Sequence, residues 1–128
     1  MADVGGNRRV RAFRATDAFA LETYRVSRFL DSKTHRSLVD EIRRAVVRSG
    51  GALVAASAAD PGGADERRYL ERARRGLLEG RYYIYIARRI GLLDLKRYRS
   101  LTVRQDVALR ELDELLGPRT SEEAVRPP

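Results

Sequence analysis

Arginines that repeat at every seventh position are the residues of this chain best suited to chemistry. They form two rows, a first row of Arg67, Arg74, Arg81 and Arg88 and a second row of Arg68, Arg75 and Arg89. Seven residues span about two turns of an α-helix, so each row would lie along one side of a helix. Guanidinium groups form paired hydrogen bonds with phosphates, and such contacts hold RNA or DNA without reading its bases. The rows therefore predict a nucleic-acid surface without sequence specificity.

A second predicted helix carries three more arginines on its exposed face, and we include them in the candidate surface: Arg43, Arg44 and Arg48. Two simpler explanations remain open for all these residues. A charged row is often a solvated helix face, here with Glu71 able to pair with neighbouring arginines. Arginine also supplies 24 of the 26 basic residues, a bias that a GC-rich genome produces without selection for binding.

The positive charge is concentrated in the third quarter of the chain. The formal net charge is +8, and residues 66–99 contain eleven Lys and Arg against four Asp and Glu. Residues 101–128 contain four basic residues against six acidic ones. A positive field of this kind attracts phosphate-rich partners and speeds encounter with them.

Signals for catalysis, metal binding or cofactor binding are missing from the sequence. There is no cysteine, and the single histidine, His35, lies in a polar segment without the partners of a catalytic triad or an HExxH motif. The sequence contains neither an N-terminal secretion signal nor an apolar run long enough to cross a bilayer. We therefore expect a non-enzymatic, cytoplasmic protein that uses no metal, cofactor or membrane.

The hydrophobic pattern predicts four amphipathic helices and no sheet. We expect them at residues 16–30, 37–58, 65–90 and 94–116. Short connections between such helices favour an all-α, antiparallel up-down-up-down four-helix bundle. The bundle would span residues 15–117, after a flexible basic arm at residues 1–14 and before a disordered tail at residues 118–128.

The helix expected at residues 65–90 has an apolar seam beside its arginines. Two heptad positions make up this seam, filled by Leu70, Leu77 and Ile84 and by Ala73, Gly80 and Ala87. Large side chains therefore alternate with small ones along one side of the helix. Residues 81–87 are rich in aromatic and branched side chains and would suit a strand, but the unbroken heptad pattern around them favours the helix.

Four residues are expected to fix the ends of the helices. Ser37 begins a capping-box pattern, and Asp65 and Asp94 are suitable N-caps for the helices that follow them. Gly91 can end the third helix in the left-handed conformation.

The glycine pair Gly50 and Gly51 lies inside the second predicted helix. Each glycine there costs about 1 kcal/mol relative to alanine. We therefore expect a bend or a close helix contact at this pair.

Beyond Leu77 the third predicted helix is apolar around most of its circumference. One bundle core cannot cover all of these side chains, and the candidate interface residues are Leu78, Tyr82, Tyr85 and Ile86. Such a surface predicts a second buried contact, most simply with another copy of the chain. The tyrosines would also suit stacking on nucleic-acid bases, but we favour their burial.

Several short motifs resemble the four-helix-bundle proteins encoded in 23S ribosomal RNA intervening sequences. They are Ile42-Arg43-Arg44-Ala45, Tyr69-Leu70, Leu77-x-Glu79 and Ile90-Gly91-Leu92-Leu93, within a match that spans about residues 13–116. The resemblance implies a small antiparallel bundle that assembles as a ring, with a pentamer expected. It also implies a similarity to the accessory variability proteins of diversity-generating retroelements, which are basic rings that bind nucleic acid and a reverse transcriptase.

Together these features predict a homo-oligomeric helical bundle that binds RNA or DNA through its arginines. The resemblance extends this prediction to an accessory role beside a reverse transcriptase in a diversity-generating retroelement. The alternative is a protein-interaction scaffold of the intervening-sequence family that has no direct role in nucleic-acid binding.

Overall fold

Four α-helices joined by short loops make up the described part of the protein. The computed structural model describes residues 4–117, with only the backbone described for residues 4–6. The helices are α1 (Val4–Ser27), α2 (Arg36–Ala58), α3 (Ala64–Arg89) and α4 (Leu95–Leu116). No strand occurs in this part of the chain, so residues 81–87 are helical as predicted. Within the same residues, no helix combines the length and the apolar character needed to span a membrane.

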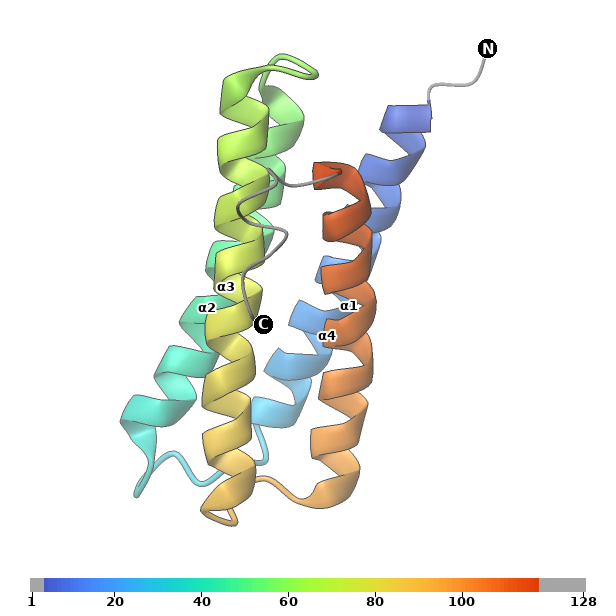
Figure 1. Ribbon diagram of the computed structural model, residues 1–128. Helices are drawn as coiled ribbons and strands as arrows, with labels where there is room; N and C mark the ends of the chain where they lie inside the picture. The colour runs from blue at the N-terminus through green and yellow to red at the C-terminus, as the bar shows by residue number, and fades with distance from the viewer. Residues whose placement is uncertain (1–3, 118–128) are drawn as a thin grey trace, which may run out of the picture.

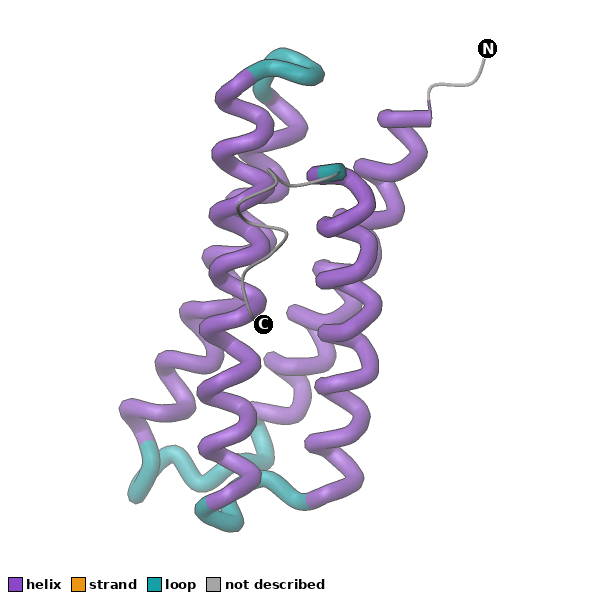
Figure 2. The backbone as a smooth tube through the Cα atoms, viewed as in Figure 1, coloured by secondary structure: helices purple, strands orange, loops and turns teal. Residues whose placement is uncertain are grey.

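The four helices lie at the corners of a square, so each contacts two neighbours. Both α1 and α3 pack against α2 and α4, whereas the described residues of the diagonal pairs are not in contact. In Figure 1, α1 and α3 run downward and α2 and α4 run upward. The loop at residues 59–63 lies at one end of the bundle, and the loops at 28–35 and 90–94 lie at the other (Figure 2). The predicted antiparallel four-helix bundle is therefore confirmed.

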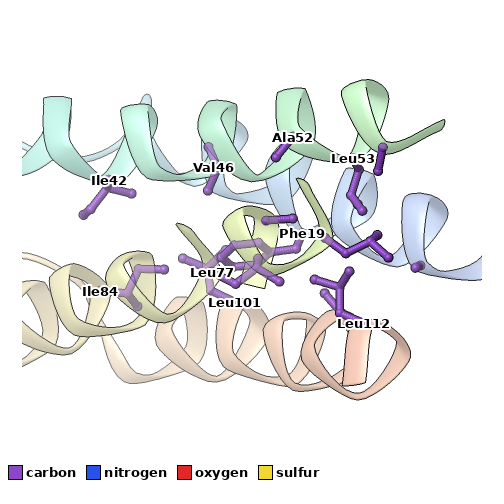
Figure 3. Close-up of a cluster of buried hydrophobic side chains, with 14 of the residues drawn as sticks. Phe19, Ile42, Val46, Ala52, Leu53, Leu77, Ile84, Leu101 and Leu112 are labelled. Atoms are coloured by element: carbon purple, nitrogen blue, oxygen red, sulfur yellow. The ribbon is translucent and has the colours of Figure 1, made fainter. Parts of the chain in front are cut away.

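Large apolar side chains from all four helices meet along the bundle axis (Figure 3). Phe19 of α1, Ile42 of α2, Leu77 and Ile84 of α3 and Leu112 of α4 are each at most 2% exposed. The predicted seam of α3 is confirmed, because all six of its residues are buried. Full burial of such a side chain stabilises a fold by about 1.5–3 kcal/mol, so this axis holds the helices together.

α1 begins much earlier than predicted. It starts at Val4 and ends at Ser27, so the expected flexible arm at residues 1–14 is wrong over residues 4–14, and the expected helix at residues 16–30 begins too late and extends three residues too far. Ala12, Thr16 and Phe19 are buried at three- and four-residue steps, so the core-facing stripe of α1 extends back to Ala12, within the supposed arm. Residues 1–3 and the predicted tail at residues 118–128 lie outside the described part of the chain.

Arginines near the start of α1 find partners on other helices, which a reading of the local sequence does not reveal. Arg9 Nη1 lies 3.1 Å from Glu66 Oε2 of α3. Arg11 Nε donates to Glu111 Oε2 of α4 at 3.4 Å. These contacts offset part of the positive charge of the supposed arm.

The junction between α3 and α4 agrees with the predicted caps. The Asp94 side chain accepts a hydrogen bond from the Arg97 backbone N–H at 2.8 Å and so caps α4. Gly91 has a φ of +80°, the left-handed conformation that glycine adopts with little strain.

The predicted caps of the two middle helices are wrong. His35 precedes α2 and Gly63 precedes α3, and neither residue forms a side-chain cap. Ser37 and Asp65 lie inside the first turns of these helices instead. Asp65 still favours α3, because a carboxylate near a helix N-terminus interacts well with the helix dipole.

A close approach between helices occurs at Gly76 of α3. A Cβ atom on this residue would lie 2.5 Å from Ser49 Oγ and 3.3 Å from the Ala45 carbonyl oxygen of α2. At Gly50 and Gly51 an added Cβ would have no neighbour within 4 Å, and α2 continues through both residues. Of the two alternatives predicted for the glycine pair, the close contact is therefore wrong, and the glycine that packing requires lies on the partner helix.

Candidate nucleic-acid interface

The first arginine row faces α4 of the same chain. Arg74 Nε donates to Asp113 Oδ1 at 2.7 Å, and Arg81 Nη1 donates to Asp106 Oδ1 at 2.5 Å. The two carboxylates are seven residues apart, as the two arginines are, and the helices are antiparallel, so the pairs form successive rungs. The four side chains remain 26–56% exposed, and exposed ion pairs of this kind contribute about 0.2–1 kcal/mol each.

The ends of the first row bond to backbone atoms near the two ends of α4. Arg67 Nη1 donates to the Leu116 carbonyl oxygen at 2.8 Å, and Arg88 Nη1 donates to the Leu93 carbonyl oxygen at 3.3 Å. The Leu116 carbonyl belongs to the last turn of α4, where carbonyls have no partner within the helix. All four arginines of the first row are thus engaged between α3 and α4.

The second row lies on the solvent side of α3. Arg75 and Arg89 are exposed and have no carboxylate partner within residues 4–117. Arg68 pairs with Asp65 one turn earlier at 2.8 Å, but both side chains are more than 60% exposed. Among residues 4–117, positive charge on this side of α3 is therefore only weakly compensated.

Arg72 adds to the same side, although the sequence prediction missed it. Its guanidinium carbon lies 5.4 Å from the centre of the Tyr69 ring, and that of Arg68 lies 5.7 Å from the same ring. Arg72 belongs to neither heptad row, but it is four residues after Arg68 and three before Arg75. Helical spacing at three and four residues would have identified it. We call Arg68, Arg72 and Arg75, with Tyr69, the open cluster.

The arginines of α2 form a separate group. Each has a partner: Arg43 the Tyr24 ring at 5.9 Å, Arg44 the Glu41 carboxylate at 2.9 Å and Arg48 the Glu79 carboxylate of α3 at 2.8 Å. Together with Tyr24 and Val47 they border a shallow hollow of about 440 Å³. The ten predicted nucleic-acid residues therefore occupy three places: the α3–α4 contact, the solvent side of α3 and the outer side of α2.

The predicted interface residues are mostly exposed in the single chain. Leu78, Tyr82 and Tyr85 are 41%, 61% and 46% exposed, while Ile86 is half-buried. Leu78 and Tyr85 lie on α3 between the first row, which faces α4, and the second row, which faces solvent, whereas Tyr82 occupies the second row itself, seven residues after Arg75. The uncovered apolar surface exists as predicted, and its burial against a second copy stays a prediction.

The titratable groups with shifted pKa values lie at helix ends, away from the open cluster. The backbone N–H of Arg97 lowers the pKa of Asp94, and hydrogen bonds from Thr34 lower the pKa of Asp31. Among residues 4–117, no three His, Cys, Asp or Glu side chains converge as metal ligands do.

The comparison with known families concerns nearly the whole bundle. A family model described as 23S rRNA-intervening sequence protein matches residues 8–114, which include all of α2 and α3 and both arginine rows. No curated protein is significantly similar to the chain. Because the match covers far more than half of the sequence, this chain belongs to the 23S rRNA-intervening sequence protein family.

Proposed function

We propose that this protein is a non-enzymatic binding protein that holds RNA or DNA through phosphate contacts at the open cluster. The observation that carries the proposal is the contrast within α3. Arg72 and Arg75 are exposed and lack a carboxylate partner within residues 4–117, whereas the middle residues of the first row are paired with α4. Arginines without internal partners gain most from an external anion.

Counterion release supplies the driving force for such binding. Each phosphate neutralised by an arginine releases condensed ions from the nucleic acid, so affinity falls steeply as salt rises. The net charge of +8 adds a long-range attraction at low salt. Tyr69, between Arg68 and Arg72, offers an aromatic surface beside the charges, an arrangement that suits single strands because bases stack on aromatic rings.

The other predicted arginines contribute less in this proposal. Arg43, Arg44 and Arg48 have partners within the chain, and a nucleic acid would have to compete for them. Among the described residues, no carboxylate pairs with Arg89. Its guanidinium carbon lies 6.0 Å from the centre of the Tyr85 ring, beside the apolar surface of α3. We assign it to the proposed assembly surface, which consists of the exposed side chains Leu78, Tyr82 and Tyr85.

Homo-oligomeric assembly is part of the proposal. The exposed residues Leu78, Tyr82 and Tyr85 support it, because single-chain proteins seldom leave such a surface uncovered. A pentameric ring, a retroelement role and a reverse transcriptase as partner rest on the family resemblance alone. The same apolar surface also favours the alternative function, a protein-interaction scaffold without nucleic-acid binding.

Fluorescence-anisotropy titration of an unrelated single-stranded RNA and an unrelated duplex DNA tests the proposal. We expect binding to both at about 50 mM salt and a loss of affinity of at least tenfold by about 200 mM. The double variant Arg72→Gln/Arg75→Gln should lower the slope of log affinity against log salt by about 1.4–1.8, because each lost phosphate contact removes about 0.7–0.9.

The variant Arg74→Gln/Arg81→Gln is the matched control. It removes the same charge from the same helix, but its arginines face α4. Its slope should change by less than half as much. Absence of binding at low salt would exclude the nucleic-acid function and favour the scaffold. Equal losses in both double variants would exclude the open cluster as the site.

A further inference from the structure

One end of the bundle exposes large apolar side chains. This end carries the loops at residues 28–35 and 90–94, at the bottom of Figure 2. Phe29 in the first loop is 68% exposed, more than any other large apolar side chain of residues 7–117. Ile90 after α3 and Leu95 at the start of α4 are 49% and 43% exposed. We call Phe29, Ile90 and Leu95 the apolar tips.

The two loops lie close together in space. The guanidinium carbon of Arg97, in the first turn of α4, lies 5.0 Å from the centre of the Phe29 ring. The first loop is therefore beside the start of α4, where Leu95 is exposed. α1 and α3 end here, and α2 and α4 begin here, so the apolar tips share one end of the bundle.

Positive charge is concentrated around the apolar tips. Residues 28–36 and 88–99 contain eight Lys and Arg against two Asp, an excess of six charges in a chain whose net charge is +8. Both aspartates form local hydrogen bonds: Asp31 Oδ1 accepts the Lys33 backbone N–H at 3.0 Å, and Asp94 caps α4. Besides Arg89, five exposed cations of this end have no carboxylate partner within residues 4–117: Arg28, Lys33, Arg36, Lys96 and Arg99.

The surface of an anionic lipid bilayer matches both features of this end. Its headgroups attract cations, and each Lys or Arg near such a surface strengthens binding about fivefold. The boundary between headgroups and acyl chains accepts apolar side chains, and binding grows with the apolar area that enters it. RNA and DNA also attract cations, but they have no apolar layer that could cover Ile90 and Leu95.

The arrangement of charges and tips suits a flat surface. Arg28 directly precedes Phe29, and Lys96 directly follows Leu95. Long basic side chains can keep their charge among headgroups while apolar neighbours go deeper. A bundle that stands on this end brings both loops to the surface at once. Exposed apolar groups rimmed by charge are typical of membrane contact sites.

We propose that this end of the bundle binds the surface of an anionic lipid bilayer, with the apolar tips inserted between the headgroups. The sequence led us to expect no membrane partner because it lacks an apolar run that could cross a bilayer, but a surface contact needs no such run. The proposal goes beyond nucleic-acid binding and does not depend on it. The open cluster lies in the N-terminal half of α3, toward the other end of the bundle, and remains free.

Tryptophan fluorescence tests the insertion directly, because the chain contains no tryptophan. Vesicles that contain phosphatidylserine and phosphatidylcholine should shift the emission of Phe29→Trp to shorter wavelength, since the indole leaves water for the headgroup region. Val103→Trp is the matched control. Val103 is 62% exposed, but it lies in the middle of α4, so no shift is expected. The absence of a shift at position 29 overturns the proposal, as does an equal shift at both positions.

Vesicle co-sedimentation at low salt tests the role of charge. Lys33 and Lys96 are the only lysines of the chain, and both lie at this end. Lys33→Gln/Lys96→Gln should lower the affinity for anionic vesicles about 25-fold, because each charge contributes about fivefold. Arg72→Gln/Arg75→Gln removes the same charge from the open cluster and should lower it less than fivefold. Equal losses in both double variants overturn the proposal, as does equal binding to vesicles of phosphatidylcholine alone.

The same variants separate membrane binding from nucleic-acid binding. Phe29→Ala should weaken vesicle binding about tenfold, because a buried phenylalanine is lost, and should leave RNA affinity and helix content unchanged. Arg72→Gln/Arg75→Gln should weaken mainly RNA binding. An unsubstituted chain that ignores anionic vesicles, while Lys33→Gln/Lys96→Gln lowers its RNA affinity, overturns the membrane proposal. A chain that binds these vesicles through Phe29 but binds no RNA or DNA overturns only the nucleic-acid function.

Discussion

The two sides of α3 that touch other helices use opposite means of contact. Toward α2 the helix presents Gly76 and Gly80, and the backbones come close enough for a Cβ on Gly76 to collide with Ser49. Toward α4 it presents Arg74 and Arg81, whose long side chains reach carboxylates on the neighbouring helix. One contact depends on the absence of side-chain atoms, and the other depends on extended, charged side chains.

One heptad pattern on α3 therefore forms two contacts that differ in how well they tolerate substitution. A tight glycine contact has no free volume, so an added methyl group forces a shift of backbone or side chain. The two side chains of an exposed ion pair give up contacts with water when they pair. Loss of the pair therefore changes the free energy of unfolding little. We therefore expect the α2 side to determine stability and the α4 side to tolerate substitution.

The largest effect is expected from Gly76→Ala. Overpacking against Ser49 and Ala45 should lower the free energy of unfolding by about 1–2 kcal/mol, although alanine is by itself the better helix former by about 1 kcal/mol. Chemical denaturation followed by circular dichroism measures the change. The additional substitution Ser49→Ala removes the oxygen that the new methyl group meets at 2.5 Å and should restore part of the loss.

The matched control is Gly51→Ala on α2. Gly51 is also inside a helix, but an added Cβ there has no neighbour within 4 Å. This variant should raise the free energy of unfolding by about 1 kcal/mol. If the two alanine variants changed stability in the same direction, the proposed difference between the two sides of α3 would be wrong.

A smaller effect is expected from breaking the rungs toward α4. Arg74→Gln and Arg81→Gln should each lower the free energy of unfolding by about 0.2–1 kcal/mol. The loss should shrink at about 1 M salt, where the Debye length is only about 3 Å. Denaturation at low and high salt measures it. A loss for either variant that exceeds that of Gly76→Ala would contradict our comparison.

The smallest effect concerns the cap that starts α4 and so helps to place its carboxylates. The hydrogen bond from Arg97 lowers the pKa of Asp94 below its ordinary value of 3.8, so the folded chain holds fewer protons there than the unfolded chain near that pH. The resulting stabilisation is present above about pH 4 and disappears as the pH falls through the lowered pKa.

Asp94→Asn keeps a good capping side chain but removes its charge. We expect this variant to be slightly less stable than the unsubstituted chain at pH 6, and the difference to shrink as the pH falls below about 4. Thermal unfolding across this range measures the trend. A difference that is constant with pH would show that the charge of Asp94 does not stabilise the cap.

The helices themselves were largely predictable from local patterns. The ends of α2, α3 and α4 fall within one residue of the predicted ranges, and the whole seam of α3 is buried. Periodicity succeeded because a helix in a bundle needs one continuous apolar side. It failed for the start of α1, where Arg9 and Arg11 are offset by carboxylates of α3 and α4.

The candidate site was only partly predictable. The sequence identified the arginine rows and the exposed surface at Leu78, Tyr82 and Tyr85. It did not identify Arg72, because we searched for a seven-residue repeat and not for the three- and four-residue spacings that also place residues side by side on a helix. Asp106 and Asp113 repeat at the same seven-residue spacing as the first row, a signal that could have predicted the rungs once the two helices were expected to be antiparallel.

By itself the sequence determined that the chain forms four helices, which residues enter the core and that two arginine rows share α3. Only the tertiary structure decided what each row faces. The direction of a row depends on the register of α3 against α4, which brings Arg74 to Asp113 and Arg81 to Asp106 across 39 and 25 residues of chain. Local periodicity fixes the side of a helix on which a residue lies, but packing between distant helices fixes what that side meets.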